Sequence, residues 1–268
     1  MTVDLEDYFC DLDFNEWENY ESRVVKLTTL LLDLFKKYNA TATFFTLGYI
    51  AEKFPDLIEK IVREGHEIAS HSYAHLDIRK ITPQEFEKDF EKSIAILEKT
   101  SGEKVRGFRA PFFSIDHRSF WAFEMIRKRL RYDSSIFPVR TPLYGIPKAP
   151  RNMYKPSKMD PTINDDSEHF IELPPATFHF PIIGNIPIAG GFYLRFLPYF
   201  LIKSGIKKIN KSGNFAMCYI HPKDLDQDMP KISQYNWYYY YGLQKALKKY
   251  ERLLKDFKFE SVREALRI

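Results

Sequence analysis

The amino-acid sequence predicts an α/β fold in a single domain, a (β/α)7-type barrel of parallel strands with helices outside. Two observations lead to this prediction. Segments rich in β-branched and aromatic residues alternate about seven times with segments of helical periodicity. Polar residues follow several of the strand-like segments, and the active sites of such barrels form at those positions. The length of 268 residues is usual for one barrel of this kind.

The strand-like segments are short, and the clearest is ATATFFTL at 40–47, which has the composition of a buried strand. The first residues of the chain form a shorter segment that ends in acidic residues. The strands expected along the chain are 2–5, 40–47, 67–69, 105–109, 131–134, 169–173 and 215–220.

Helices are expected between these strands. Leucines recur at helical spacing between Ser22 and Tyr38. The stretch 82–85 (TPQE) combines a threonine N-cap, a first-turn proline and a glutamate at the third position, which is typical of a helix start. A break is expected at Pro55. The expected helices are 22–38, 48–63, 82–100, 117–129, 196–209, 235–257 and 261–266.

One domain is expected to cover residues 1–268. Residues 138–166 are rich in proline and lack periodicity, which predicts a long loop excursion. Residues 235–268 are expected to form a helical C-terminal extension. The paired glycines of 189–193 indicate a loop whose backbone approaches a neighbour closely.

The charge pattern does not indicate a nucleic-acid-binding protein. The net charge is +4, and Lys and Glu interleave along the helical segments, as on solvated helix faces. The sequence contains no run of about 18 apolar residues, so no membrane span is expected. The lack of a signal peptide predicts a cytoplasmic location. Cys10 and Cys218 show no CxxC pattern, so no disulfide framework is expected. The sequence does not indicate an oligomeric state.

His71 and His75 lie four residues apart. In a helical turn their rings would leave the same face and close on one metal ion. The alternative is a surface helix with two unrelated histidines. A metal held by imidazoles takes a third protein ligand, usually a carboxylate, and keeps a position open for water. The stretch 2–9 (TVDLEDYF) supplies carboxylates, so we expect a hydrolytic site with one divalent metal ion, Zn²⁺ being favoured.

Polar residues also stand where other predicted strands end. In a parallel barrel these positions share the face at the carboxyl ends of the strands, and packing alone does not require polar residues there. The residues concerned are Asp4, His71, Arg109, Asp133 and His221. Asp133 is a candidate for contacting the substrate or for holding the residues that do. The alternative is a turn aspartate that caps its own loop.

In their order, these stretches resemble the polysaccharide deacetylases of carbohydrate esterase family 4, the NodB-homology fold. The resemblance implies a distorted barrel, covers nearly the whole chain, and is strongest to the branch linked to exopolysaccharide loci, which suggests a role in exopolysaccharide biosynthesis. The matching stretches are 4–9 (DLEDYF), 71–75 (HSYAH), 107–113 (GFRAPFF), 132–138 (YDSSIFP), 188–199, 221–222 (HP) and 259–266.

The resemblance implies a role for each matching residue. Asp4 matches the general base, and Arg109 matches the arginine that pairs with and orients it. His71 and His75 match the metal-ligand histidines. His221 matches the general acid that protonates the leaving amine.

The chain departs from the common family motif TFDDG, in which the aspartate after the base ligates the metal. Leu5 stands at that position and cannot ligate, so the carboxylate must come from Glu6 or Asp7. Because residue i+2 of a strand returns to the same face, Asp4 and Glu6 would both face the pocket. Some relatives use a D-x-D spacing, which also favours Glu6, and Asp7 stays open.

Further residues are expected to contact the substrate. Tyr219, two residues before the acid, matches the slot that walls the acetyl pocket, and a backbone N–H near Phe112 is expected to stabilise the oxyanion. The run 237–241 (WYYYY) is either a platform for stacking sugars or a core face with one or two exposed rings, and its helical spacing favours the core face.

The resemblance implies a metal-dependent hydrolase that removes the N-acetyl group from an N-acetylhexosamine unit of a glycan or glycan precursor. An activated water and a proton for the departing amine are what this chemistry needs. Two alternatives stay open. One is a hydrolase of another non-peptide amide, similar to the allantoinases, and the other is a glycan-binding pseudoenzyme.

Overall fold

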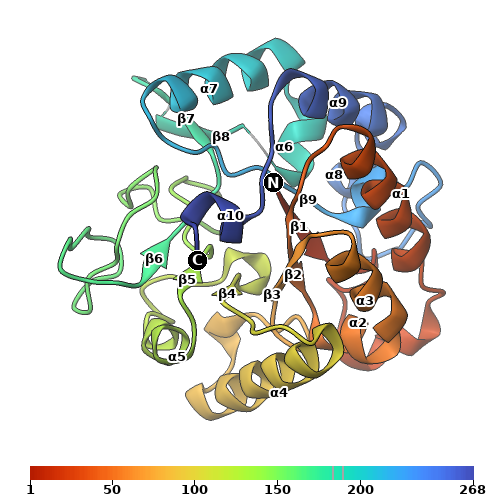
Figure 1. Ribbon diagram of the computed structural model, residues 1–268, viewed down its shortest axis with the longest axis horizontal. Coiled ribbons are helices and arrows are strands. Elements are labelled where there is room, and N and C mark those ends of the chain that lie inside the picture. The colour runs from red at the N-terminus through yellow and green to blue at the C-terminus, as the bar shows by residue number, and fades with distance from the viewer. Residues whose placement is uncertain (183, 189) are drawn as a thin grey trace.

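The computed structural model describes residues 1–182, 184–188 and 190–268. Seven strands form one curled parallel sheet in the order β6-β5-β4-β3-β2-β1-β9 (Figure 1). The strands are β1 Thr2–Leu5, β2 Thr43–Thr46, β3 Glu67–Ser70, β4 Gly107–Phe108, β5 Tyr132–Asp133, β6 Ile171–Glu172 and β9 Tyr219–Ile220. The predicted (β/α)7-type barrel is confirmed. Within the described residues the outermost strands β6 and β9 do not pair, which is the distortion of the barrel.

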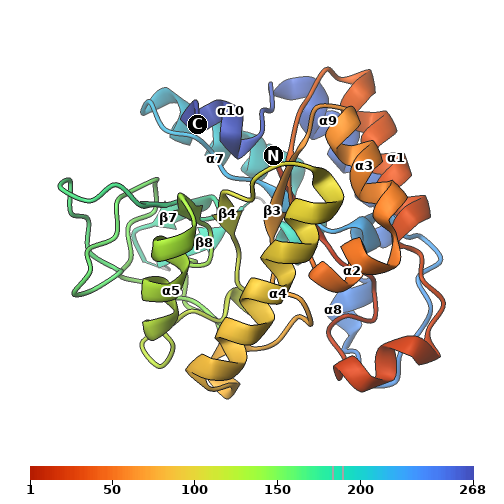
Figure 2. The same cartoon turned by 60° about the horizontal axis from the view of Figure 1, so that its bottom comes forward.

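Helices surround the sheet (Figures 1 and 2). They are α1 Val24–Lys37, α2 Gly48–Lys53, α3 Pro55–Arg63, α4 Pro83–Ser101, α5 Trp121–Arg129, α6 Gly191–Phe196, α7 Tyr199–Lys211, α8 Trp237–Tyr240, α9 Leu243–Asp256 and α10 Val262–Leu266. The start of α4 has the predicted capping box, since the Thr82 hydroxyl accepts from the Glu85 N–H and the Glu85 carboxylate accepts from the Thr82 N–H. These reciprocal bonds satisfy backbone donors that the helix itself leaves free.

The amino ends of the strands are closed by α10. Its Val262 packs into a buried interior cluster with Phe45 and Tyr132. The Val262 N–H donates to the Thr43 hydroxyl at 2.7 Å, and the Arg263 N–H donates to Glu67 at 2.8 Å. Since Thr43 and Glu67 begin β2 and β3, α10 covers the end of the barrel opposite to the predicted site.

The second half of the chain differs from the expectation at three places. The expected helix 235–257 is two helices, α8 and α9, because Gly242 adopts a left-handed φ of 77° between them. The expected helix 196–209 is α7, which begins at Tyr199 after Pro198, and Phe196 is the last residue of the separate helix α6. An antiparallel hairpin of β7 Thr177–Phe180 and β8 Gly184–Pro187 was not predicted.

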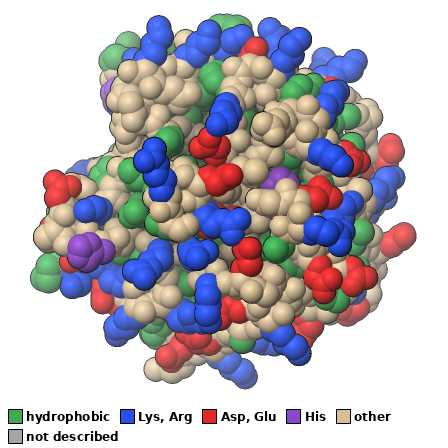
Figure 3. Space-filling model, viewed as in Figure 1, with side chains coloured by type: hydrophobic (Ala, Val, Ile, Leu, Met, Phe, Trp, Pro, Cys, Tyr) green, Lys and Arg blue, Asp and Glu red, His purple; other side chains and the backbone are tan. Residues whose placement is uncertain are grey.

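The surface agrees with the sequence-based expectation of solvated faces. On the face seen in Figure 1, Lys and Arg side chains are interspersed with Asp and Glu (Figure 3). Among the residues that the structure describes, no helix combines the length and the apolar character needed to cross a membrane.

Candidate active site

A cavity of about 600 Å³ opens at the carboxyl ends of the strands. Its size lies in the range of roughly 300–1,000 Å³ that is usual for small-molecule sites. Most of the predicted site residues line it, namely Asp4, Glu6, His71, His75, Phe112, Tyr219 and His221.

Asp4, the predicted base, is buried on β1 and held by Arg109. Nη1 of Arg109 donates to Oδ1 of Asp4 at 2.6 Å and to the Thr2 hydroxyl at 3.0 Å. Its Nη2 donates to the Ser134 hydroxyl at 2.8 Å, and its guanidinium lies 4.2 Å from the centre of the Phe45 ring. Both charged groups are buried, so the charge of each compensates the buried charge of the other. The planar guanidinium also fixes the orientation of the carboxylate.

The HxxxH segment is not helical, contrary to the expectation. It forms a loop after β3 in which Ser72 and His75 adopt left-handed φ values of 67° and 54°. The carboxylate of Asp89, on α4, accepts hydrogen bonds from the N–H groups of Tyr73 and Ala74 at 2.8 and 3.0 Å. The loop conformation, anchored by Asp89, therefore replaces the expected helical turn in positioning the two histidines.

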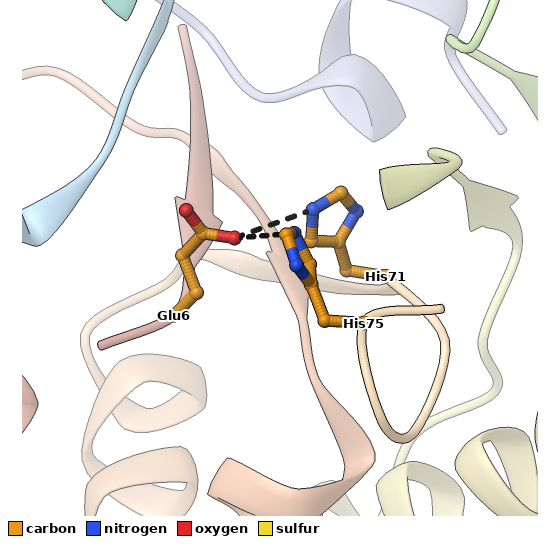
Figure 4. Close-up of side chains that lie close together, drawn as sticks. All are labelled: Glu6, His71 and His75. Atoms are coloured by element: carbon orange, nitrogen blue, oxygen red, sulfur yellow. Dashed lines mark ion pairs between the residues drawn. The ribbon is translucent and has the colours of Figure 1, made fainter. Parts of the chain in front are cut away.

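The side chains of Glu6, His71 and His75 converge (Figure 4), with one potential ligand atom of each lying within 4.8 Å of the others. Oε2 of Glu6 is 2.8 Å from Nε2 of His75 and 3.7 Å from Nε2 of His71. This Oε2 is buried and has no hydrogen bond of good geometry to any described residue. The 2.8 Å contact is thus an ion-pair distance without hydrogen-bond alignment.

The protonation states of two of these three side chains, His71 and Glu6, are the ones that bind metal. Burial lowers the pKa of His71 to about 4, so its imidazole is neutral. Burial raises the pKa of Glu6, but Lys223 and His75 outweigh it and hold the pKa well below its usual range. Burial also opposes the charge on His75, whose pKa the Glu6 carboxylate nevertheless raises. Neutral imidazole and carboxylate are the forms that bind metal, and a donor set of two nitrogens and one oxygen fits Zn²⁺.

A buried lysine lies beside the group, and it was not predicted. Nζ of Lys223 is 2.7 Å from Oε1 of Glu6 and 2.9 Å from Oδ2 of Asp11. Oδ1 of Asp11 lies 3.7 Å from Nδ1 of His75, which is buried and has no hydrogen-bond partner in the described part of the chain. Burial disfavours the ammonium, but Asp11 and Glu6 raise the pKa of Lys223 well above its usual value.

Asp7 points away from the histidines. Its carboxylate accepts hydrogen bonds from the N–H groups of Tyr8, Arg23 and Val24 at 2.9, 2.9 and 3.1 Å, and from the Ser22 hydroxyl. Asp7 therefore caps the start of α1. Of the two acids that the sequence left open, the structure brings Glu6 to the histidines, and Asp7 is not part of the group.

His221 follows β9 and is fixed by Asp224, the acidic partner that the sequence did not identify. Nδ1 of His221 is 2.9 Å from Oδ2 of Asp224, and its Nε2 is 3.7 Å from Oδ2 of Asp4. Nε of Arg195 lies 3.0 Å from Oδ1 of Asp224. Burial lowers the pKa of His221, but Asp224 outweighs it and the pKa is raised. Burial likewise raises the pKa of Asp224, whereas His221 and Arg195 lower it overall.

Tyr219 forms an apolar wall of the cavity. Its ring is buried, with ring centres 5.3 Å from Phe113 and 6.2 Å from Phe137. A Cβ at Gly190 would lie 1.8 Å from the Tyr219 ring, so only glycine fits there. This is the close approach expected for 189–193, although Ala189 lies outside the described residues. Phe112 has a φ of 56°, and its ring centre lies 4.5 Å from that of His75.

Asp133 is fully buried on β5 and does not line the cavity. Its carboxylate accepts hydrogen bonds from the N–H and hydroxyl of Ser135, both at 2.8 Å, and the Ser135 hydroxyl accepts from the Ala110 N–H at 2.8 Å. Burial raises the pKa of Asp133 to about 6. Asp133 therefore supports the loop that carries Arg109, and it does not face the cavity in which a substrate would bind.

Two family models match the chain. Residues 17–126 match the model described as polysaccharide deacetylase, and residues 134–267 match one described as a domain of unknown function (DUF3473). The two matches are consecutive along the chain. The second one includes His221 and Asp224, and the description of its model assigns no function.

The chain is similar to curated peptidoglycan deacetylases. It is 36% identical over 101 residues to the peptidoglycan-N-acetylglucosamine deacetylase of Bacillus cereus, which covers 37% of this chain and 37% of that protein. It is 27% identical over 221 residues to the peptidoglycan deacetylase of Helicobacter pylori, covering 78% and 64% of the two chains. The matched regions thus span less than two thirds of the length of these relatives.

The fold is also similar to a solved structure. A Mycobacterium smegmatis protein assigned to the polysaccharide deacetylases superposes with a TM-score of 0.63 at 18% identity, covering 100% of this chain and 87% of that one. At this identity, the likeness shows a shared fold and no more.

Proposed function

Because this chain belongs to the polysaccharide deacetylase family, the NodB-homology fold of carbohydrate esterase family 4, we propose that it is a metal-dependent hydrolase that removes the N-acetyl group from an N-acetylhexosamine unit of a glycan. One observation carries the proposal. Oδ2 of Asp4 and Nε2 of His221 face each other at 3.7 Å in the cavity that Glu6, His71 and His75 also line. A carboxylate and an imidazole so placed suit a base and an acid acting on one substrate.

We propose that Glu6, His71 and His75 hold one divalent metal ion, with Zn²⁺ favoured by the two imidazoles. Such an ion, when bound, lowers the pKa of a water molecule and polarises a carbonyl group. The protein prepares the ligands in advance. Nδ1 of His71 donates to the Arg109 carbonyl at 2.7 Å, so that its Nε2 keeps the lone pair that faces Glu6.

Asp4 would act as the base. Arg109 holds Oδ1, which leaves Oδ2 directed towards His221 and the cavity. As the water oxygen forms a bond to the acetamide carbon, its proton passes to Asp4. The guanidinium of Arg109 holds the Asp4 carboxylate in a fixed orientation. The carboxylate therefore does not have to reorient during the reaction, which lowers the barrier.

His221 would act as the acid. When the carbon–nitrogen bond breaks, Nε2 of His221 gives its proton to the departing amine, and acetate and the free amino sugar result. The Asp224 carboxylate on Nδ1 raises the pKa of His221, which keeps the imidazole protonated until this step. Tyr219 would wall the acetyl methyl group, and the backbone N–H near Phe112 would face the oxyanion.

Acetate release tests the proposal. The protein is incubated with N-acetylated oligosaccharides, and separately with allantoin and other small amides, each with and without added zinc. We expect acetate from the N-acetylated sugars, more of it with zinc, and none after chelation. Hydrolysis of the small amides in preference to the sugars would contradict the proposal and favour the allantoinase-like alternative. Binding of the sugars without release of acetate would favour a glycan-binding pseudoenzyme.

The sequence resemblance further suggests a substrate from exopolysaccharide biosynthesis.

A further inference from the structure

The positive charge of the chain is concentrated on two neighbouring helices. Together, α7 and α9 hold nine of the 40 Lys and Arg residues but only two of the 36 Asp and Glu residues. The rest of the chain is left with 31 basic and 34 acidic residues, so it has a net negative charge. The whole positive excess of the sequence therefore comes from α7 and α9.

Both acidic residues of these helices are already paired. Nζ of Lys37 lies 3.0 Å from Oε1 of Glu251, and Nζ of Lys203 lies 2.8 Å from Oδ2 of Asp256. Lys249 is engaged as well, because its Nζ donates to two backbone carbonyls just before α7, at 2.8 and 2.9 Å. The other basic side chains of the two helices are exposed and form no ion pair with any residue that the structure describes. We call these seven residues the basic surface: Lys207, Lys208, Lys211, Lys245, Lys248, Arg252 and Lys255.

The basic surface differs from an ordinary solvated helix face. Such a face mixes both signs of charge, as α4 does with its three lysines and five acidic residues. The helix α7 has four lysines and no acidic residue. Figure 3 shows Lys and Arg side chains along the upper edge of the molecule, where Figure 1 has α7 and α9. A one-sign field of this kind attracts an anionic partner.

Exposed aromatic rings border the basic surface. Phe200 on α7 is 69% exposed, and Phe196, three residues before α7, is 49% exposed. The Phe196 ring lies 5.6 Å from that of Tyr241, which is 44% exposed and stands two residues before α9. Trp237 is 65% exposed, so the run 237–241 does not form the core face that its spacing favoured. Lysines beside exposed apolar rings are typical of surfaces that lie in the interface of a bilayer.

The chemistry of the basic surface favours an anionic bilayer over a nucleic acid. Six of its seven residues are lysines. Lysine is a point charge and lacks the planar fork with which arginine recognises a phosphate group or a base edge. Lysines near an anionic bilayer are attracted by its surface potential, and each raises the affinity roughly fivefold. The exposed rings add apolar area that enters the headgroup region.

We propose that the basic surface, together with Phe200, binds the protein peripherally to an anionic membrane surface. The inference goes beyond the proposed function and does not depend on it. Docking in this way brings the cavity close to the bilayer. Phe192 lines the cavity, and Phe196, about one turn further along α6, borders the basic surface.

Sedimentation with lipid vesicles tests the proposal. The vesicles contain phosphatidylcholine alone, or phosphatidylcholine with roughly one third phosphatidylglycerol. We expect binding to the anionic vesicles only, and its loss at high salt, because salt screens the attraction. The triple variant Lys207→Glu, Lys208→Glu, Lys211→Glu should lower the partition coefficient at least about a hundredfold. Phe200→Ala should lower it about tenfold, whereas Phe200→Trp should retain it.

The matched control reverses three lysines on the opposite side of the molecule. Lys88→Glu, Lys99→Glu, Lys128→Glu changes the net charge equally, and these exposed residues belong to α4 and α5, far from α7 in Figure 1. This variant should keep its binding to anionic vesicles. Circular dichroism checks that both triple variants fold. Neither should lose acetate release from a soluble N-acetylated oligosaccharide, since none of the six lysines lines the cavity.

Several results would overturn the inference. Equal binding to neutral and anionic vesicles, binding to neither, or equal losses in the two triple variants would each do so. Retention by double-stranded DNA without binding to anionic vesicles would assign the basic surface to a nucleic acid instead. A change of oligomeric state in the α7 variant, with unchanged vesicle binding, would make it an interface between copies of the chain. Absence of acetate release, in contrast, would contradict the proposed function and leave the vesicle result unaffected.

Discussion

The backbone carbonyl of Arg109 accepts a hydrogen bond of 2.7 Å from Nδ1 of His71. The guanidinium of the same residue donates to Asp4 at 2.6 Å. One residue thus sets the tautomer of a proposed metal ligand through its backbone and orients the proposed base through its side chain. Substitution of the side chain separates these two effects, because it leaves the carbonyl in place.

Arg109→Lys should therefore reduce catalysis without removing the metal. Lysine keeps the positive charge but lacks the planar fork that orients a carboxylate. We expect kcat to fall at least about tenfold, since general acid–base steps contribute roughly 10²–10⁴-fold. Metal per chain, measured by elemental analysis, should not change. Arg118→Lys is the control, since Arg118 pairs with Asp116 at the surface. An unchanged kcat in Arg109→Lys would mean that another group orients Asp4.

Glu6→Gln and Asp7→Asn should have opposite consequences. Glu6→Gln should lower the metal content, because Glu6 supplies the only carboxylate of the described group with His71 and His75. Asp7→Asn should retain the metal but lower the free energy of unfolding by about 0.5–2 kcal/mol, the usual effect of weakening a helix cap. Elemental analysis and urea denaturation of both variants make the comparison. Metal loss in Asp7→Asn with full occupancy in Glu6→Gln would reverse the assignment of the third ligand.

The fold could be predicted from local sequence patterns, because tertiary contacts did not change the elements that these patterns specify. The capping box at Thr82 and Glu85 and the apolar strand around Phe44 and Phe45 are specified by neighbouring residues, so the alternation of strands and helices was predictable. Helical periodicity, in contrast, continues across Gly242, and a left-handed glycine that divides α8 from α9 does not disturb it. For this reason the interruption was missed.

The site was predictable where spacing determines it and not where long-range contacts do. The pair His71 and His75 was found, but the expected helix was wrong, because the left-handed φ of His75 is rare for a non-glycine residue and leaves no sequence signal. The sequence favoured Glu6 but could not exclude Asp7, because what excludes it is a long-range contact: Asp7 caps a helix that begins at Val24. Asp224 is only three residues beyond His221, and that spacing was an available signal.

Asp224→Asn should shift the pH profile. The Asp224 carboxylate raises the pKa of His221, so its loss lowers that pKa. The acid works only when protonated, and its contribution disappears as the pH rises through its pKa. The alkaline limb of kcat/KM should therefore move to lower pH, and activity at neutral pH should fall. Asp256→Asn, which removes a surface carboxylate paired with Lys203, should leave the limb in place. An alkaline limb that does not move in Asp224→Asn would exclude His221 as the group that titrates there.

The central claim is that Asp4 and His221 are an opposed base and acid. Both groups are needed when the leaving group is an amine, which departs only with a proton. An activated ester has a leaving group that departs without one, so it needs the base but not the acid. The two substrates therefore distinguish the two roles.

The most direct measurement compares the rates at which the unmutated protein, Asp4→Asn and His221→Ala hydrolyse an N-acetylated oligosaccharide and p-nitrophenyl acetate. We predict that Asp4→Asn slows both reactions by about 10²–10⁴-fold, because both need an activated water. His221→Ala should slow release of acetate from the sugar to a similar extent and slow the ester reaction far less. Equal losses on both substrates in His221→Ala would contradict the account, since His221 would then be a ligand or a structural residue and not the acid.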